Sequence, residues 1–101
     1  MGDEKQVRRD TSNIYVGPKP LMNYVTAVVM QFTTKGSKEV TLKARGKFTA
    51  RAIDIAQVAR ERFLKDMNIQ LGAINICSES FKNKEGKDIR VSSLSIKLIK
   101  K

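Results

Sequence analysis

Four positively charged side chains close together form the strongest chemical signal in this chain. They lie within nine residues with no acidic residue among them, and they are Lys43, Arg45, Lys47 and Arg51. Alternation along an extended strand would place Lys43 and Arg45 on the same face, and Gly46 would let a ligand approach the backbone closely. A row of cations at this spacing suits the phosphates of a nucleic acid. A solvated strand face is the alternative, although clustered like charges repel each other unless an anionic partner is present.

A second group of cations lies near the C-terminus, between two segments that alternate as strands. Residues 82–90 carry these cations together with Glu85 and Asp88, and Glu85-Gly86 fits a tight hairpin turn. A projecting basic ribbon can follow a groove of nucleic acid, and arginine suits a narrow minor groove. An ordinary solvated hairpin is the alternative. The candidate contacts are Lys82, Lys84, Lys87 and Arg90.

A single lysine between two prolines is a third and weaker candidate. Pro18 and Pro20 each fix one backbone torsion and lack an N–H donor, so they stiffen the turn that carries Lys19. Pro20 also suits the first position of a helix. A rigid turn beside a helix start can hold a cation where it meets a phosphate.

The residues that enzymes most often use are scarce. The chain contains no histidine, which excludes His-based triads, His acid–base pairs and His-ligated zinc sites. A metal-dependent nuclease using Asp54 and Glu61 is a remote alternative. These carboxylates stand seven residues apart on a polar helix face, where salt bridges with Arg51 and Lys65 explain them more simply. We therefore expect no enzyme, no metal, no cofactor and no small-molecule substrate.

The whole chain is strongly basic, which agrees with a polyanionic partner. Its 101 residues carry 20 lysines and arginines against 10 acidic residues, a formal net charge of +10. Nucleic acid suits such a surface better than membrane does, because no run of about 18 apolar residues could span a bilayer. The polar residues 1–10 are unlike a signal peptide. The single cysteine, Cys77, excludes an internal disulfide and fits a reducing compartment, so we expect a cytoplasmic protein.

The pattern of apolar residues predicts two helices and four strands around one core. Helical spacing extends over about 21–34, closed by Gly36, and over about 48–64. We expect one two-layer α+β domain over 13–101, with the order β-α-β-α-β-β, a projecting C-terminal hairpin and a flexible tail over 1–12. The expected strands are 13–16, 40–45, 74–81 and 89–98.

Two finer expectations concern the last strand and the aromatic residues. The apolar alternation changes phase between Val91 and Leu94, which predicts a bulge or a strong twist there. Phe81, near the hairpin, is the aromatic residue whose place is least certain. Because few aromatic side chains are left to be exposed, stacking of single-stranded bases is not expected as the main binding mode. The aromatic residues expected in the core are Tyr15, Tyr24, Phe32 and Phe48.

Taken in order, these segments resemble the Alba family of archaeal chromatin proteins over residues 13–101. The agreement is dispersed and keeps the spacing of the family. Its most specific pieces are Asn13-Ile14-Tyr15-Val16-Gly17, Lys19-Pro20-Leu21-Met22-Asn23-Tyr24-Val25, Lys43-Ala44-Arg45-Gly46-Lys47, Ala52-Ile53-Asp54, Arg60-Glu61-Arg62-Phe63-Leu64 and Arg90-Val91-Ser92-Ser93-Leu94-Ser95-Ile96.

The resemblance implies a fold similar to the C-terminal domain of bacterial translation initiation factor three, assembled as a homodimer with two hairpin arms that reach toward minor grooves. In that pattern Lys19 matches a DNA-contacting lysine, Arg45 and Lys47 match basic contacts of the body, and residues 82–90 match the arm. Phe63 matches an aromatic used in contacts between dimers along DNA. Many relatives carry a second lysine, open to acetylation, where this chain has Pro18.

The function that follows from the resemblance and the charge is architectural. We expect a chromosome-associated protein that coats and compacts double-stranded DNA with little sequence specificity and binds RNA as well. An RNA-binding subunit of a ribonucleoprotein, or an RNA chaperone, is the alternative, since a basic patch does not choose between the two nucleic acids. Preference for B-form over A-form duplex would separate them.

Overall fold

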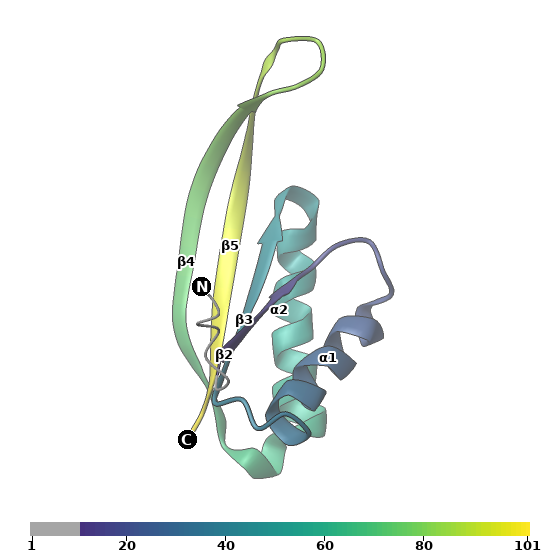
Figure 1. Cartoon of the computed structure of the whole chain (residues 1–101), viewed down its shortest axis with the longest axis vertical. Helices are drawn as coiled ribbons and strands as arrows, with labels where there is room; N and C mark the ends of the chain where they lie inside the picture. The colour runs from purple at the N-terminus through teal and green to yellow at the C-terminus, as the bar shows by residue number, and fades with distance from the viewer. Residues whose placement is uncertain (1–10) are drawn as a thin grey trace, which may run out of the picture.

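The computed structural model describes residues 11–101 as a four-stranded sheet with two helices packed on one of its faces (Figure 1). This confirms the expected α+β domain and its order of elements. Thr11 and Ser12, expected in the tail, belong to the first strand, while residues 1–10 lie outside the described part of the chain. The elements are β2 (Thr11–Tyr15), α1 (Leu21–Thr33), β3 (Glu39–Arg45), α2 (Thr49–Val58), β4 (Ile69–Lys82) and β5 (Asp88–Lys100).

The sheet has the strand order β2-β3-β5-β4, so the two longest strands pair at one edge. β2 runs parallel to β3, and the other neighbours are antiparallel. Period-two alternation in β3 turns Val40, Leu42 and Ala44 toward the helices, where all three are buried. Leu98 and Ile96 lie opposite Val40 and Leu42 on β5 and continue the same core.

Helix α1 begins and ends as its sequence predicts. It starts directly after Pro20, and the residues at helical spacing, Val25, Val28 and Phe32, are buried against the sheet. Gly36 follows its last turn with φ of +69°, a left-handed conformation that glycine adopts without steric cost.

Helix α2 is shorter than the expected 48–64. A 3₁₀ turn over Gly46–Phe48 precedes it, and a π-helical turn over Ala59–Phe63 follows it. The wider turn is closed by the Leu64 N–H, which donates to the Ala59 carbonyl at 2.9 Å. A π-helical turn contains one residue more than an α-helical turn, and this extra residue rotates the part of the chain that follows. Leu64 therefore enters the core, while Phe63, which is expected on the buried face, is exposed.

The ends of β4 and β5 project beyond the rest of the sheet, as the sequence predicts (Figure 1). β3 makes its last pair where Arg45 meets Ser93, and from there the two strands pair only with each other. We call residues 78–92 the arm and residues 83–87 the arm tip. The arm raises the radius of gyration to 15.0 Å, against about 13 Å for a compact domain of this length.

The turn at the arm tip is longer than a two-residue turn at Glu85-Gly86. Lys82 pairs with Asp88, which leaves five residues in the loop. The Asn83 carboxamide oxygen accepts hydrogen bonds from the backbone N–H groups of Glu85 and Lys87, at 2.9 and 3.0 Å. This local alternative to a tight turn is typical of asparagine.

The phase change in β5, where a bulge or a strong twist is expected, contains no bulge, and the register shift of this strand pair lies in β4 instead. Pairing along β5 is continuous through Val91 and Leu94, so the apolar residues there change from one sheet face to the other as the arm leaves the body. The register shift falls between Leu71 and Ile74. Gly72 lies within it, and a Cβ at that position would come within 2.5 Å of Ile99 Cδ1.

Candidate nucleic-acid interface

Two basic loops lie at the end of the body from which the arm projects (Figure 1). The loop between β2 and α1 carries Lys19, and the turn between β3 and α2 carries Lys47. Both lysines are exposed. The structure therefore brings these two predicted contacts to the same end of the molecule, although they lie 28 positions apart in the sequence.

The loop that carries Lys19 is held by side chains from both helices. The Tyr24 hydroxyl accepts hydrogen bonds from the Gly17 N–H at 2.9 Å and from the Lys19 N–H at 3.3 Å. The Arg51 guanidinium donates to the Lys19 carbonyl at 2.8 Å. Arg51, predicted as a phosphate contact, thus positions the backbone of this loop, while the ammonium group of Lys19 is left to the solvent.

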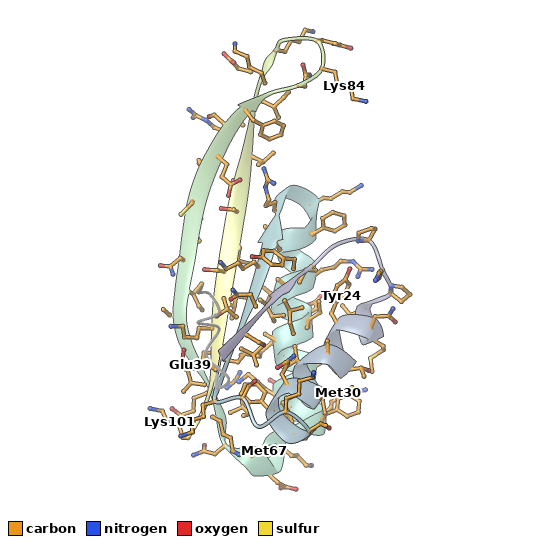
Figure 2. The ribbon with its side chains drawn as sticks, viewed as in Figure 1. Tyr24, Met30, Glu39, Met67, Lys84 and Lys101 are labelled. Atoms are coloured by element: carbon orange, nitrogen blue, oxygen red, sulfur yellow. The ribbon has the colours of Figure 1, made fainter. Side chains whose placement is uncertain are left out.

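The cations of the arm are almost fully solvated. Lys84 lies in the arm tip (Figure 2), and Lys87 closes the same loop. Lys82 forms an ion pair with Asp88 at 3.1 Å, with both side chains highly exposed, so this pair contributes little to stability. Arg90 lies opposite Ser80 and is also exposed.

Lys43 and Arg45 lie apart from these groups, on the side of the sheet that the helices leave uncovered, which we call the open face. The register places Lys43 beside Tyr15, and its ammonium lies 5.9 Å from the centre of that ring. The Arg45 guanidinium forms an ion pair with Glu79 at 3.0 Å and lies 5.6 Å from the centre of the Phe81 ring. The predicted cluster over residues 43–51 is thus divided between two surfaces.

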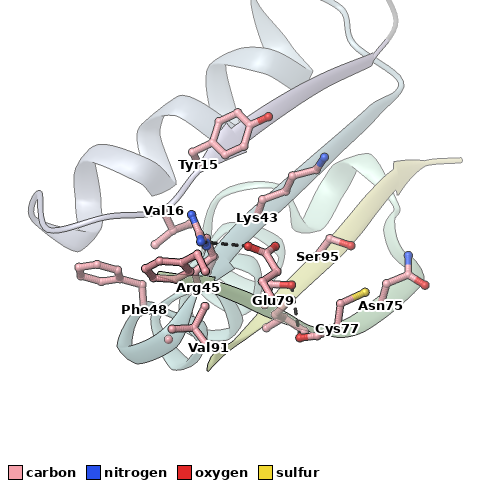
Figure 3. A pocket seen from close by; sticks show the side chains of 15 residues that line it. Tyr15, Val16, Lys43, Arg45, Phe48, Asn75, Cys77, Glu79, Val91 and Ser95 are labelled. Carbon is pink, nitrogen blue, oxygen red and sulfur yellow. Dashed lines mark hydrogen bonds and ion pairs between the residues drawn. The ribbon is translucent and has the colours of Figure 1, made fainter. Parts of the chain in front are cut away.

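The open face is hollowed between β2 and the base of the arm (Figure 3). The hollow has a volume of about 760 Å³. Its charged side chains are Lys43, Arg45 and Glu79, and its aromatic residues are Tyr15, Phe81 and the half-buried Phe48. Small and polar side chains also line it, among them Asn75, Cys77, Ser93 and Ser95.

The aromatic residues only partly follow the prediction. Tyr24 and Phe32 are buried as expected and Phe48 is half-buried, but Tyr15 was wrongly expected in the core, since 70% of it is exposed. A signal for this existed in the sequence: Val16, which follows it, is buried, and alternation turns Tyr15 the other way. For Glu79 no local signal existed, because its partner Arg45 comes from a distant strand.

The remaining predicted residues have simple surroundings. Phe63 is half exposed at the end of the π-helical turn. Glu61 accepts a hydrogen bond from Gln57, and Asp54 is exposed on α2. Within residues 11–101, no three acidic, histidine or cysteine side chains gather as a metal site would require, so nothing in this part of the chain supports the nuclease alternative. None of the helices described combines the length and the apolar character that crossing a membrane requires.

Comparison with known proteins gives one consistent answer. The family model named Alba matches residues 12–97. The "DNA/RNA-binding protein Alba" of Methanocella arvoryzae is 49% identical over 83 residues, covering 82% of this chain and 83% of the relative. The protein of the same name from Nanoarchaeum equitans is 46% identical over 87% of this chain and 97% of its own. The solved structure of Alba from Thermoplasma volcanium aligns with a TM-score of 0.78 at 38% identity, over 87% of this chain and 99% of that chain.

Proposed function

The chain belongs to the Alba family, and on that premise we propose that it coats and compacts double-stranded DNA with little sequence specificity. One observation carries the proposal: Lys19 and Lys47 lie at the end of the body from which a basic arm projects. The loops of the body and the arm both present cations at this end of the molecule. They can therefore contact the same polyanion at two places.

The chemistry of these cations favours phosphates over bases. Lysine ammonium groups on exposed loops act as point charges, and each one that neutralises a phosphate releases condensed counterions. Such contacts fix the position of a protein on a duplex and carry no direct sequence information. Lys19, Lys47, Lys84 and Lys87 are of this kind, since all four are exposed.

The arm supplies the reach that a flat basic surface lacks. Among residues 11–101 no third strand pairs with it beyond Ser93, so it is a two-stranded ribbon, and its cations lie along it and at its tip. Arg90 is its arginine, and arginine is favoured by the negative potential of a narrow minor groove. In this proposal the body lies on the backbone while the arm follows an adjacent groove.

An uncovered apolar surface on β4 supports assembly as a homodimer. Leu71, Ile74 and Ile76 pair with core residues of β5, so they point to the helix side of the sheet. Helix α2 packs on β3 and β5 and does not cover these three side chains of β4. All three side chains are therefore exposed, and Ile76 is 77% exposed. An edge strand that exposes such a row invites pairing with another chain.

Helix α2 borders this apolar surface of β4. Residues three and four apart share a helix face, so Ile53 and Gln57 of α2 and Arg60 of the π-helical turn that follows form one stripe. The Arg60 guanidinium donates to the carbonyl of Ile69, at the start of β4, which shows that the stripe faces that strand. Exposed Ile53 consequently lies beside the same apolar surface. We propose that a second copy of the chain covers it, which doubles the number of basic loops and arms.

RNA is the second candidate partner, because the relatives carry names that include both nucleic acids. Phosphate contacts by exposed lysines serve either polymer. The arm discriminates between them, since the narrow, deep major groove and wide minor groove of A-form RNA differ from the grooves of B-form DNA. We propose that the protein is cytoplasmic and associates with the chromosome by binding duplex DNA through its loops and arm.

The test combines assembly with binding to two unrelated duplex sequences. Sedimentation at micromolar concentration should give about twice the monomer mass of 11.4 kDa. Ile76→Asp places a charge on the apolar surface of β4, and it should yield monomers that bind both duplexes more weakly because each particle has only half of the cations. Gln70→Asp adds the same charge on the other face of β4 and is the matched control.

Three results would contradict the proposal. A wild-type species with a mass near that of the monomer would exclude the proposed homodimer. A strong preference for one duplex means that bases are read directly. Weak binding by Gln70→Asp equal to that of Ile76→Asp means that added negative charge, and not loss of the second copy, explains the effect.

A further inference from the structure

We propose that the hollow on the open face binds unpaired nucleotides of a single-stranded nucleic acid, separately from the surface that contacts duplex. The inference rests on the proposed nucleic-acid function, but it concerns a different surface. It arises from Tyr15, whose exposure contradicts the expectation that few aromatic rings are available for stacking. The exposed rings and the cations of the open face meet in one hollow.

The two exposed aromatic rings, Tyr15 and Phe81, lie at different places in the hollow, which half-buried Phe48 also lines. Tyr15 comes from β2, at one edge of the sheet, and Phe81 comes from β4, at the other edge. Tyr15 is 70% exposed and Phe81 is 44% exposed, so both rings have free surface on which a base can stack. Stacking tolerates every base because each one has a π face, and bases locked inside a duplex cannot use it.

Each ring has its own cation. Lys43 reaches over Tyr15, and Arg45 reaches over Phe81, at 5.9 and 5.6 Å from the ring centres. A ring beside a cation matches the two parts of a nucleotide, a flat base and a phosphate. Stacking platforms for single strands combine these groups in the same way.

The ion pair between Arg45 and Glu79 lowers the net positive charge of the hollow. Two cations and one carboxylate leave a single excess positive charge among the lining residues, which suits the one negative charge of a nucleotide phosphate. The carboxylate also holds the guanidinium against the Phe81 ring. Around these groups, Asn75, Ser93 and Ser95 supply neutral donors and acceptors that any base edge can use.

The size and the placement of the hollow agree with this ligand. Its volume, about 760 Å³, falls in the range of small-ligand sites, about 300–1,000 Å³. The hollow also lies on the opposite side of β4 from Ile74 and Ile76, so the proposed dimer leaves it open.

The first test compares single strand with duplex in variants that remove one ring. The probes are a fluorescently labelled thymidine homopolymer, which has no self-pairing, and a labelled duplex of mixed sequence. Tyr15→Leu and Phe81→Leu should each lower the affinity for the single strand by about tenfold, the typical cost of removing one ring on which a base stacks. Affinity for the duplex should stay at the wild-type value in Tyr15→Leu, because Tyr15 lies on β2 and outside the arm.

Two control variants separate stacking from other effects. Tyr15→Phe keeps the ring and removes only the hydroxyl, so it should bind the single strand as the wild type does. Met30→Ala truncates a half-exposed side chain on α1, which does not line the hollow, and it should change neither affinity. Equal losses for single strand and duplex in Tyr15→Leu, or no loss of single-strand affinity in either leucine variant, would overturn the proposal.

The second test uses the wild-type protein and therefore does not depend on how the variants fold. Cys77 is the only cysteine of the chain, it is exposed, and it lines the hollow. Saturating thymidine homopolymer should slow alkylation of its thiol, and saturating duplex should not.

The other outcomes of the thiol test count against the proposal. Equal protection by duplex would make the hollow part of the duplex surface. Protection that rises with protein concentration alone would mean that a second copy covers the open face. If neither nucleic acid binds at all, the proposed function itself fails, whereas duplex binding without protection of Cys77 by the single strand refutes only this inference.

Discussion

The body and the arm of this molecule are made from the same two strands under different constraints. In the body, β5 pairs on both sides and turns Ile96 and Leu98 into a core closed by two helices. In the arm, β5 pairs only with β4, and most side chains there are exposed. A two-stranded ribbon alone is at best marginally stable in water. The body therefore holds the arm in place, and the arm is free to carry charge.

The difference shows how one hairpin can serve two purposes. Positions in the body are constrained by packing, and exchange of a side chain there changes the free energy of unfolding. Positions in the arm have few packing neighbours, so lysines and arginines cost little stability there. This division between body and arm can be tested in two ways, by measuring the stability of variants and by measuring their affinity for duplex DNA.

The largest expected effect is a difference in the free energy of unfolding between two variants of β5, one with a side chain truncated in the body and one with a side chain truncated in the arm. Leu98→Ala removes a fully buried side chain of the body and should lower the free energy of unfolding by about 2–5 kcal/mol. Val91→Ala, seven residues earlier on β5, lies in the arm and should cost less than about 1 kcal/mol. Urea denaturation measures both. Equal losses would mean that arm and body form one packed unit.

A smaller effect, on binding and not on folding, is expected from shortening the arm. An Asn-Gly turn in place of residues 83–87 keeps the pair between Lys82 and Asp88 and removes Lys84 and Lys87 together with Glu85. Removing two cations from each subunit should weaken duplex binding by about tenfold or more at moderate salt, while circular dichroism and unfolding stay unchanged. Unaltered affinity would exclude the arm tip from the binding surface.

Much of this division could be predicted from the sequence because it depends on local periodicity. Apolar residues at helical spacing indicated α1 correctly, and the Gly36 conformation closes it as expected. The long alternating segments indicated a projecting hairpin, and the ordered set of motifs indicated the family. These features need no knowledge of which distant segments meet.

The features that the sequence did not reveal depend on interactions between distant segments. Phe63 and Leu64 are both apolar, and only the π-helical turn decides that Leu64 is buried. The cluster over residues 43–51 looked like a single cationic row, yet Arg45 meets Glu79 from a strand that lies 34 positions further along the chain. Arg51 likewise holds the loop of Lys19, a role that only the tertiary structure shows.

The central claim is that duplex binding depends on phosphate contacts by the loops and the arm, and the salt dependence of affinity tests it most directly. If Lys19, Lys47 and one or two arm cations engage in each subunit, a dimer neutralises about 6–8 phosphates, which predicts a slope of log K against log salt concentration of about −5 to −7. Lys47→Ala should make the slope shallower by about 1 for each phosphate that is no longer neutralised, and Lys35→Ala, on the loop at the other end of the body, should not change it. A nearly flat slope for the wild type would contradict the account.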